Sequence, residues 1–149
     1  MGKRFFSWTG VSLRTVLLLA LLGAPRVIAH DLGLVEPNGA ANQFLVFAPA
    51  IMWIAYVVWK KAKKPFIVLF SIGLCYGFYV GVIHQLFLGH VFGDSLQLGG
   101  NLRHLSSSAA ELIARPFAFI SSVATGAGVG LIVGVIGAAV NRIELFLRK

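Results

Sequence analysis

The sequence is short of charged residues and almost without cysteine. Only 12% of its 149 residues are charged, five residues are acidic, and 58% are hydrophobic. An average soluble domain has about 25% charged residues, so this composition, with a mean hydropathy of +0.85, excludes an ordinary soluble domain and predicts a membrane protein. Cys75 is the single cysteine, which excludes an intrachain disulfide and a complete cysteine zinc site.

The basic residues outnumber the acidic ones and give a formal charge of +8. They occur mostly in short clusters at the ends of apolar runs, without the interleaved aromatic residues typical of a nucleic-acid surface. This arrangement is typical of basic residues that determine membrane topology. We therefore expect no nucleic-acid partner.

The first 29 residues have the parts of a secretory signal peptide. A basic beginning precedes an apolar run over residues 15–24, Pro25 interrupts the run, and a small residue, Ala29, stands at the predicted cleavage position. Cleavage there would leave a mature chain that begins at His30. The alternative is an uncleaved first anchor, shortened by Pro25, since a spanning helix needs about 20 apolar residues.

The remaining chain, residues 30–149, is predicted to be one membrane domain. A polar, turn-rich external arm should precede a first span over residues 44–59, with further spans over residues 66–91 and 117–140. The predicted fold is therefore an all-α integral membrane helical bundle with three spanning helices, or four if the leader is retained.

Four lysines follow the first of these spans: Lys60, Lys61, Lys63 and Lys64. By the positive-inside rule they place this loop in the cytoplasm; a role in binding lipid headgroups is the alternative. The mature N-terminus is then external and the C-terminus cytoplasmic, whether or not the leader is cleaved.

The last span should begin with a capping box. Ser108 and Glu111 have the S-x-x-E spacing, so we expect a helix to start near Ala109. Pro116 allows a bend after Arg115, with the segment before it lying along the membrane interface.

Two of the spans have small residues at intervals of four. Such residues let two helix backbones approach closely in lipid. The two faces could pack on each other within one chain, or leave one face for a partner protein or a second copy. The first face comprises Gly73, Gly77 and Gly81; the second comprises Ser122, Gly126, Gly130, Gly134 and Ala138.

His84 is the one ionisable residue expected inside the membrane, and it follows Gly81 by three residues on nearly the same helical face. An intramembrane ionisable residue is a candidate functional site. With Gln85 beside it, the simpler interpretation is a neutral histidine hydrogen-bonded across a helix interface. Every acidic residue, Asp31 included, falls outside the predicted spans, so we expect no buried carboxylate to pair with His84.

The histidines offer a possible transition-metal site on the outer side, and copper would suit a terminal amine together with imidazoles. The candidate ligands are His30, His84, His90 and His104. His84 and His90 cannot chelate jointly from one straight helix, because six residues turn them by about 120° and separate them by about 9 Å. No metal-binding motif supports the site, so no cofactor is predicted outside this alternative.

The sequence contains little else that suggests chemistry. Ser106, Ser107 and Ser108 lie near His104, but no acidic residue is placed to orient a nucleophile and base. We therefore expect a non-enzymatic integral membrane protein, an accessory or assembly subunit of a membrane complex with a membrane-protein partner or a second copy of itself. The alternative is a metal-handling or small-solute transport component that uses the outer-side histidines.

Overall fold

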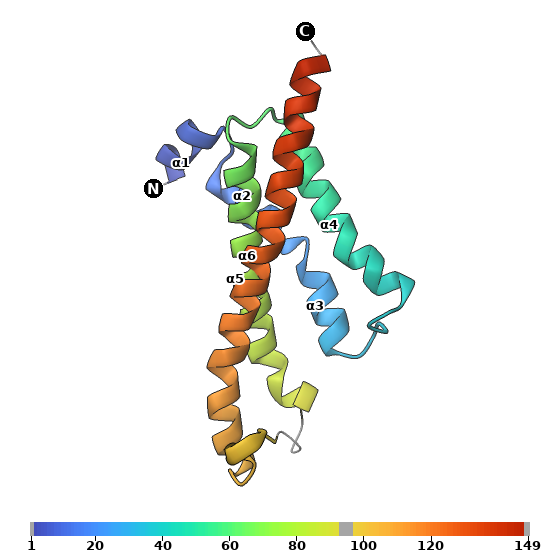
Figure 1. Ribbon diagram of the computed structural model, residues 1–149, viewed down its shortest axis with the longest axis vertical. Helices are drawn as coiled ribbons and strands as arrows, with labels where there is room; N and C mark the ends of the chain where they lie inside the picture. The colour runs from blue at the N-terminus through green and yellow to red at the C-terminus, as the bar shows by residue number, and fades with distance from the viewer. Residues whose placement is uncertain (1, 93–96, 148–149) are drawn as a thin grey trace.

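The computed structural model describes residues 2–92 and 97–147, and the side chains of residues 4–87 and 97–147. Every regular element within these ranges is a helix (Figure 1). The helices are α1 (Gly2–Thr9), α2 (Leu13–Leu21), α3 (Ala24–Asp31), α4 (Ala40–Trp59), α5 (Pro65–Phe92), the short 3₁₀ helix η2 (Gly100–Leu102) and α6 (Ser107–Leu147).

Four helical segments in the described residues are long and apolar enough to cross a membrane. They are Leu13–Asp31, Ala40–Trp59, Pro65–Phe87 and Ser107–Leu147. The predicted all-α membrane bundle is confirmed. The segment Leu13–Asp31 is the additional span expected of an uncleaved leader.

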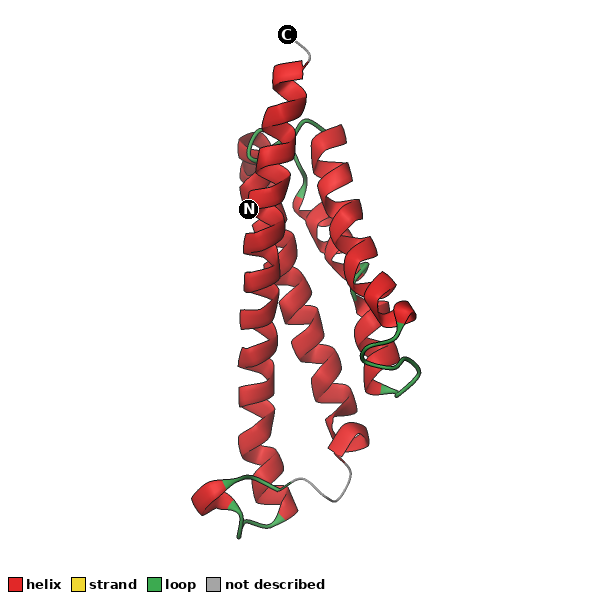
Figure 2. Ribbon diagram, turned by 45° about the vertical axis from the view of Figure 1, so that its right-hand side comes forward, coloured by secondary structure: helices red, strands yellow, loops and turns green. Residues whose placement is uncertain are grey.

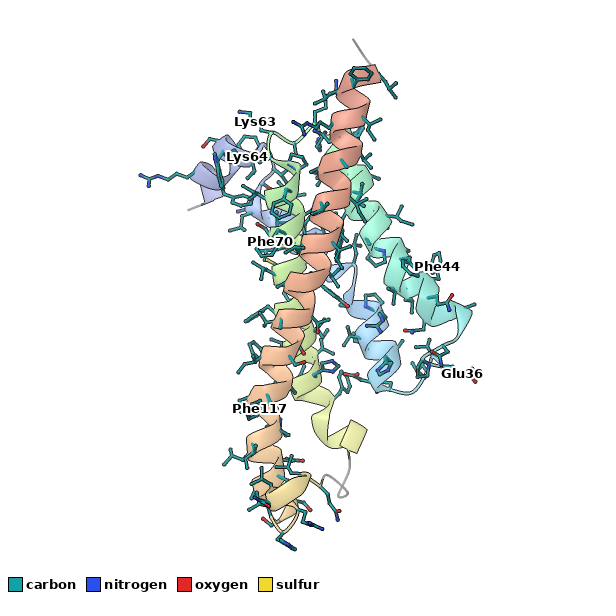
Figure 3. All side chains as sticks on the ribbon, viewed as in Figure 1. Glu36, Phe44, Lys63, Lys64, Phe70 and Phe117 are labelled. Carbon is teal, nitrogen blue, oxygen red and sulfur yellow. The ribbon has the colours of Figure 1, made fainter. Side chains whose placement is uncertain are left out.

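Helices α5 and α6 lie side by side along most of their length and form the long axis of the molecule, with α4 beside them (Figures 1 and 2). Helix α1, the α4–α5 loop and the C-terminal end of α6 lie toward one end of the bundle, and the start of α6 lies at the other (Figure 1). Large apolar side chains such as Phe44 and Phe117 point outward (Figure 3) and are 71% and 69% exposed. An exposed apolar surface of this kind is what the lipid acyl chains would cover.

Helices α5 and α6 touch backbone to backbone. A Cβ atom placed on Gly126 would lie 2.5 Å from the carbonyl oxygen of Gly73, and one placed on Gly77 would lie 2.8 Å from the carbonyl oxygen of Ser122. Contact continues at Gly130, where a Cβ would lie 2.9 Å from the carbonyl oxygen of Phe70. Only residues without a side chain allow this approach, which brings many weak dispersion contacts into range along the two helices.

The two small-residue faces predicted from the sequence therefore meet each other within one chain. The outer members of the faces contact aromatic side chains: Gly81 lies against Phe119, and Gly134 lies against Phe66. Ala138, the last member, is half-buried.

Helices α2 and α3 pack against α5. Helix α2 ends at Leu21 and α3 restarts with Pro25 in its first turn, a position where proline's missing N–H costs no hydrogen bond. Gly23 lies at this junction, where a Cβ would come within 2.6 Å of the Tyr76 ring. Trp53 of α4 also joins the junction, because its Nε1 donates a 2.7 Å hydrogen bond to the carbonyl oxygen of Leu19. That carbonyl is in the last turn of α2, where it also accepts from the backbone N–H of Leu22 at 3.1 Å.

The four-lysine loop contacts α1. The Nζ of Lys63 donates to the carbonyl oxygen of Ser7 at 3.3 Å, and the Nζ of Lys64 lies 4.1 Å from the centre of the Trp8 ring (Figure 3). The loop therefore holds α1 against one end of the bundle.

Helix α6 differs from its prediction in two ways. It begins at Ser107, and the serine that caps it is Ser106, whose Oγ accepts from the backbone N–H of Ala109 at 3.4 Å; Ser108, predicted to be the cap, lies inside the first turn. The helix also continues through Pro116 to Leu147. Its 41 residues extend for about 60 Å, twice the thickness of the hydrocarbon core of about 30 Å, so the helix is too long to lie wholly within it.

Candidate functional site

A carboxylate is buried between α3 and α5 and is hydrogen-bonded to the intramembrane histidine. Asp31 is the last residue of α3, and its side chain is only 2% exposed. Its Oδ2 lies 2.7 Å from Nδ1 of His84 on α5, and its Oδ1 lies 3.4 Å from Nδ1 of His30. A buried carboxylate is costly unless it is paired and hydrogen-bonded, and here two imidazoles meet that need.

This pair corrects the expectation that no buried carboxylate would face His84. Asp31 was expected on an external arm, since it follows the predicted cleavage position and belongs to a polar, turn-rich segment. Pro25 instead begins a second helix, and α3 brings Asp31 onto α5. The sequence offered only the spacing of Val27 and Asp31, which are four residues apart and so share one face of a helix; their burial on α5 comes from the packing of α3.

His84 contacts α3, whereas its position beside Gly77 and Gly81 suggested that it would contact the same helix as those glycines. Gly77 and Gly81 face α6, whereas the hydrogen bond of His84 is made to α3. The His84 side chain is 33% exposed. In the Asp31–His84 pair the carboxylate is therefore buried and the imidazole is partly exposed.

A second polar contact, one residue further along α5, joins it to α6. Gln85 donates from Nε2 to the carbonyl oxygen of Arg115 at 2.9 Å, and Arg115 donates from Nη1 to the carbonyl oxygen of Gln85 at 3.1 Å. The other guanidinium nitrogen of Arg115 lies 3.4 Å from a carboxylate oxygen of Glu111. The sequence identified Gln85 as a polar contact but missed its partner, since a basic residue near a span end is usually only a topology signal.

The predicted metal ligands are only partly brought together. His30 and His84 share the Asp31 carboxylate, while His104 lies in the exposed segment before α6. His90 belongs to α5, but its side chain lies outside the described residues. In the described part of the chain, no group of three or more histidine, cysteine or acidic residues is arranged to hold a metal ion. Metal binding stays a prediction.

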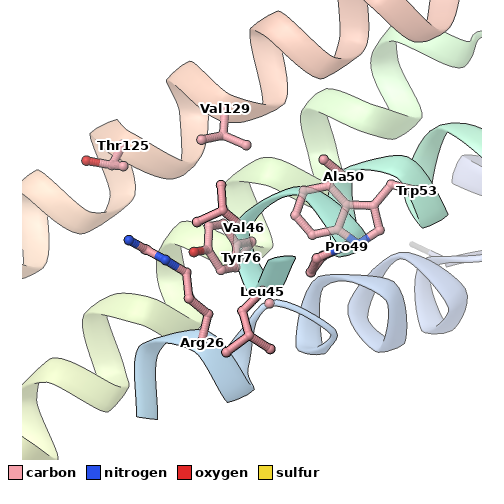
Figure 4. Close-up of a pocket in the computed structure, with 10 residues that line it drawn as sticks. Arg26, Leu45, Val46, Pro49, Ala50, Trp53, Tyr76, Thr125 and Val129 are labelled. Carbon is pink, nitrogen blue, oxygen red and sulfur yellow. The ribbon is translucent and has the colours of Figure 1, made fainter. Parts of the chain in front are cut away.

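A cavity of about 140 Å³ lies between α3, α4, α5 and α6 (Figure 4). Its wall is mostly apolar, with three polar or amphipathic contributors: Arg26, Tyr76 and Thr125. The Arg26 side chain extends from α3 in the direction of α6 (Figure 4). Asn42 holds one end of the guanidinium, because its Oδ1 accepts from Nε of Arg26 at 3.3 Å while its own Nδ2 donates to the carbonyl oxygen of Pro37.

Comparison of the chain with family models, with characterised proteins and with solved structures finds no match.

Proposed function

We propose that this protein is a proton-responsive component of its membrane, and that the Asp31–His84 contact is the responsive element. The observation that carries the proposal is a carboxylate that is 2% exposed and lies 2.7 Å from an imidazole, in segments apolar enough to span a membrane. Carboxylate and histidine side chains inside a membrane are the groups from which proton-handling sites are built.

The chemistry of the pair gives the response its direction. An imidazole can change its charge between about pH 5 and 8. When it is charged it attracts the carboxylate as an ion pair, and when it is neutral it offers only a hydrogen bond. The contact should therefore hold α3 to α5 more tightly when the imidazole is protonated than when it is neutral.

The surroundings contain few competing charges. His30 shares the carboxylate, α4 contributes no charged residue, and the Arg115 guanidinium of α6 is paired with Glu111. Arg26 lies on α3 itself and is bonded to Asn42.

The experiment is a set of thermal unfolding measurements in lipid nanodiscs between pH 5.5 and 8. The wild-type midpoint should fall as the pH rises, and His84→Gln, whose side chain keeps hydrogen-bonding ability but carries no ionisable proton, should clearly weaken this dependence, with any remainder due to His30 on the same carboxylate. His104→Gln is the matched control, because His104 is exposed and should leave the wild-type profile intact. A His84→Gln profile that follows the wild type would refute the proposal.

Transport is the more specific form of this function, and it corresponds to the solute-transport alternative from the sequence. Proton flux into liposomes that Asp31→Asn abolishes would assign a carrier. A pH-dependent midpoint without flux would assign a sensor.

The accessory-subunit hypothesis stays a separate prediction. The α5–α6 contact occupies the small-residue faces, one of which could have been left for a partner helix, so a partner would have to use another surface. Purification in mild detergent tests it, since a stable monomer without a copurifying protein would count against a partner.

For the leader, we favour retention over cleavage. Val16, Ala20 and Val27 are 0–2% exposed, and removing residues 1–29 would uncover the surfaces of α4 and α5 that they cover. Asp31 is brought to His84 by α3, most of which precedes the predicted cleavage position, so the proton-response proposal also rests on retention of the leader. The predicted orientation, with His30 external and the C-terminus cytoplasmic, is retained.

A further inference from the structure

We propose that Arg26 binds the phosphate group of an anionic phospholipid, and that part of one acyl chain of this lipid lies in the apolar cavity between α3, α4, α5 and α6. This site is separate from the Asp31–His84 pair and does not rest on the proton-response proposal.

The first support is the charge of Arg26 in its surroundings. Arg26 lies within the membrane-spanning segment Leu13–Asp31, and none of the described residues that line its cavity is acidic. Among the side chains of residues 4–87 and 97–147, Arg26 forms no ion pair; its contact is a neutral hydrogen bond from Nε to Asn42. Charged side chains inside membranes are almost always paired, so this guanidinium calls for an anion.

The second support is the geometry of the donors. The bond to Asn42 uses Nε and leaves the two terminal nitrogens of the guanidinium for a ligand. A guanidinium can present two parallel N–H groups to a phosphate, which makes arginine well suited to this anion. Asn42 is 6% exposed and orients the side chain, so less rotamer freedom is lost on binding.

The third support is depth. Arg26 precedes Asp31, the end of the span, by five residues, or about 7.5 Å along a helix. A long arginine side chain can reach the headgroup region from this position. The cavity wall beside it is suited to an acyl chain, since Leu45, Val46 and Pro49 of α4 face Val129 of α6 across it. An amphiphile matches this combination of one cation and an apolar wall better than a fully polar solute does.

Trp53 lines the same cavity and provides the readout. Replacing Trp8 and Trp59 by phenylalanine leaves Trp53 as the one tryptophan, since the chain has three. This variant is placed in phosphatidylcholine nanodiscs that contain either brominated phosphatidylglycerol or brominated phosphatidylcholine, whose acyl chains quench a tryptophan that they contact. A basic residue near the membrane surface favours an anionic lipid by about 1 kcal/mol, so we expect a roughly fivefold preference for the brominated anionic lipid.

Variants in the same background separate the lipid site from a general charge effect. Arg26→Gln should remove the preference, Arg26→Lys should keep part of it, and Arg103→Gln, in the exposed segment before α6, should leave it unchanged. Far-UV circular dichroism and the Trp53 emission in unbrominated lipid verify that each variant is folded.

Three outcomes would overturn the assignment. Equal quenching by both lipids with Arg26 present would show that the cavity does not select an anionic lipid. Loss of the preference on addition of inorganic phosphate would identify the ligand as a free anion. The mass of the intact protein is measured first. A mass that corresponds to residues 30–149 would show that the leader, with Arg26, has been cleaved.

Discussion

The close contact between α5 and α6 can be tested by adding a single methyl group. In Gly126→Ala the new Cβ would lie 2.5 Å from the carbonyl oxygen of Gly73, whereas ordinary van der Waals contact begins near 3.4 Å. The clash is with backbone, which cannot rotate away, so the helices must separate by about 1 Å at this point.

Separation of the helices weakens the dispersion attraction between them. A gap of 0.5–1 Å removes about a quarter to a half of each dispersion interaction of roughly 0.1–0.2 kcal/mol. If ~20–40 atom pairs across the crossing are affected, the unfolding free energy falls by about 0.5–4 kcal/mol. Gly128→Ala is the matched control, because its Cβ would meet nothing within 4 Å. Both substitutions gain the same helix propensity, about 1 kcal/mol, so their difference isolates the packing term.

The assay is reversible unfolding in mixed micelles, followed by far-UV circular dichroism as the fraction of denaturing detergent increases. Gly126→Ala should unfold at a lower fraction than Gly128→Ala. Gly73→Ala should resemble Gly126→Ala, and the double variant should cost less than the sum of the two, since the same gap has already opened. Equal midpoints for Gly126→Ala and Gly128→Ala would refute the backbone contact.

Two further predictions concern the contacts that join the other helices. Trp53→Phe removes one of the two donors to the carbonyl oxygen of Leu19, which keeps its bond from the backbone N–H of Leu22. It should lower the unfolding free energy by about 0.5–1.5 kcal/mol, the net contribution of one hydrogen bond; unchanged stability would show that water replaces the indole. Arg115→Ala removes the hydrogen bond to the Gln85 carbonyl and the ion pair with Glu111. It should accelerate amide hydrogen exchange at the start of α6, whereas Arg103→Ala should not. Equal exchange in both variants would contradict a stabilising contact between α5 and α6 at Arg115.

Local composition was sufficient to predict the helices themselves. The predicted spans over residues 44–59 and 66–91 fall within Ala40–Trp59 and Pro65–Phe92, because long apolar runs bounded by polar residues have few other stable forms in a membrane. The start and the predicted bend of α6 were less accurate. Ser106 and Ser108 are equally suitable N-cap residues by sequence, and proline can be accommodated inside a helix in a packed bundle.

The amino-acid order was enough to predict an all-helical membrane bundle in which two helices present small-residue faces, since hydropathy and four-residue spacing are local properties. What the polar residues do depends instead on how the helices are arranged in three dimensions. Asp31 and His84 are 53 positions apart, and they meet because the α2–α3 junction packs against Tyr76 and fixes how far α3 reaches along α5. Contacts of this kind depend on the relative position of whole helices, which is set by the packing of many residues.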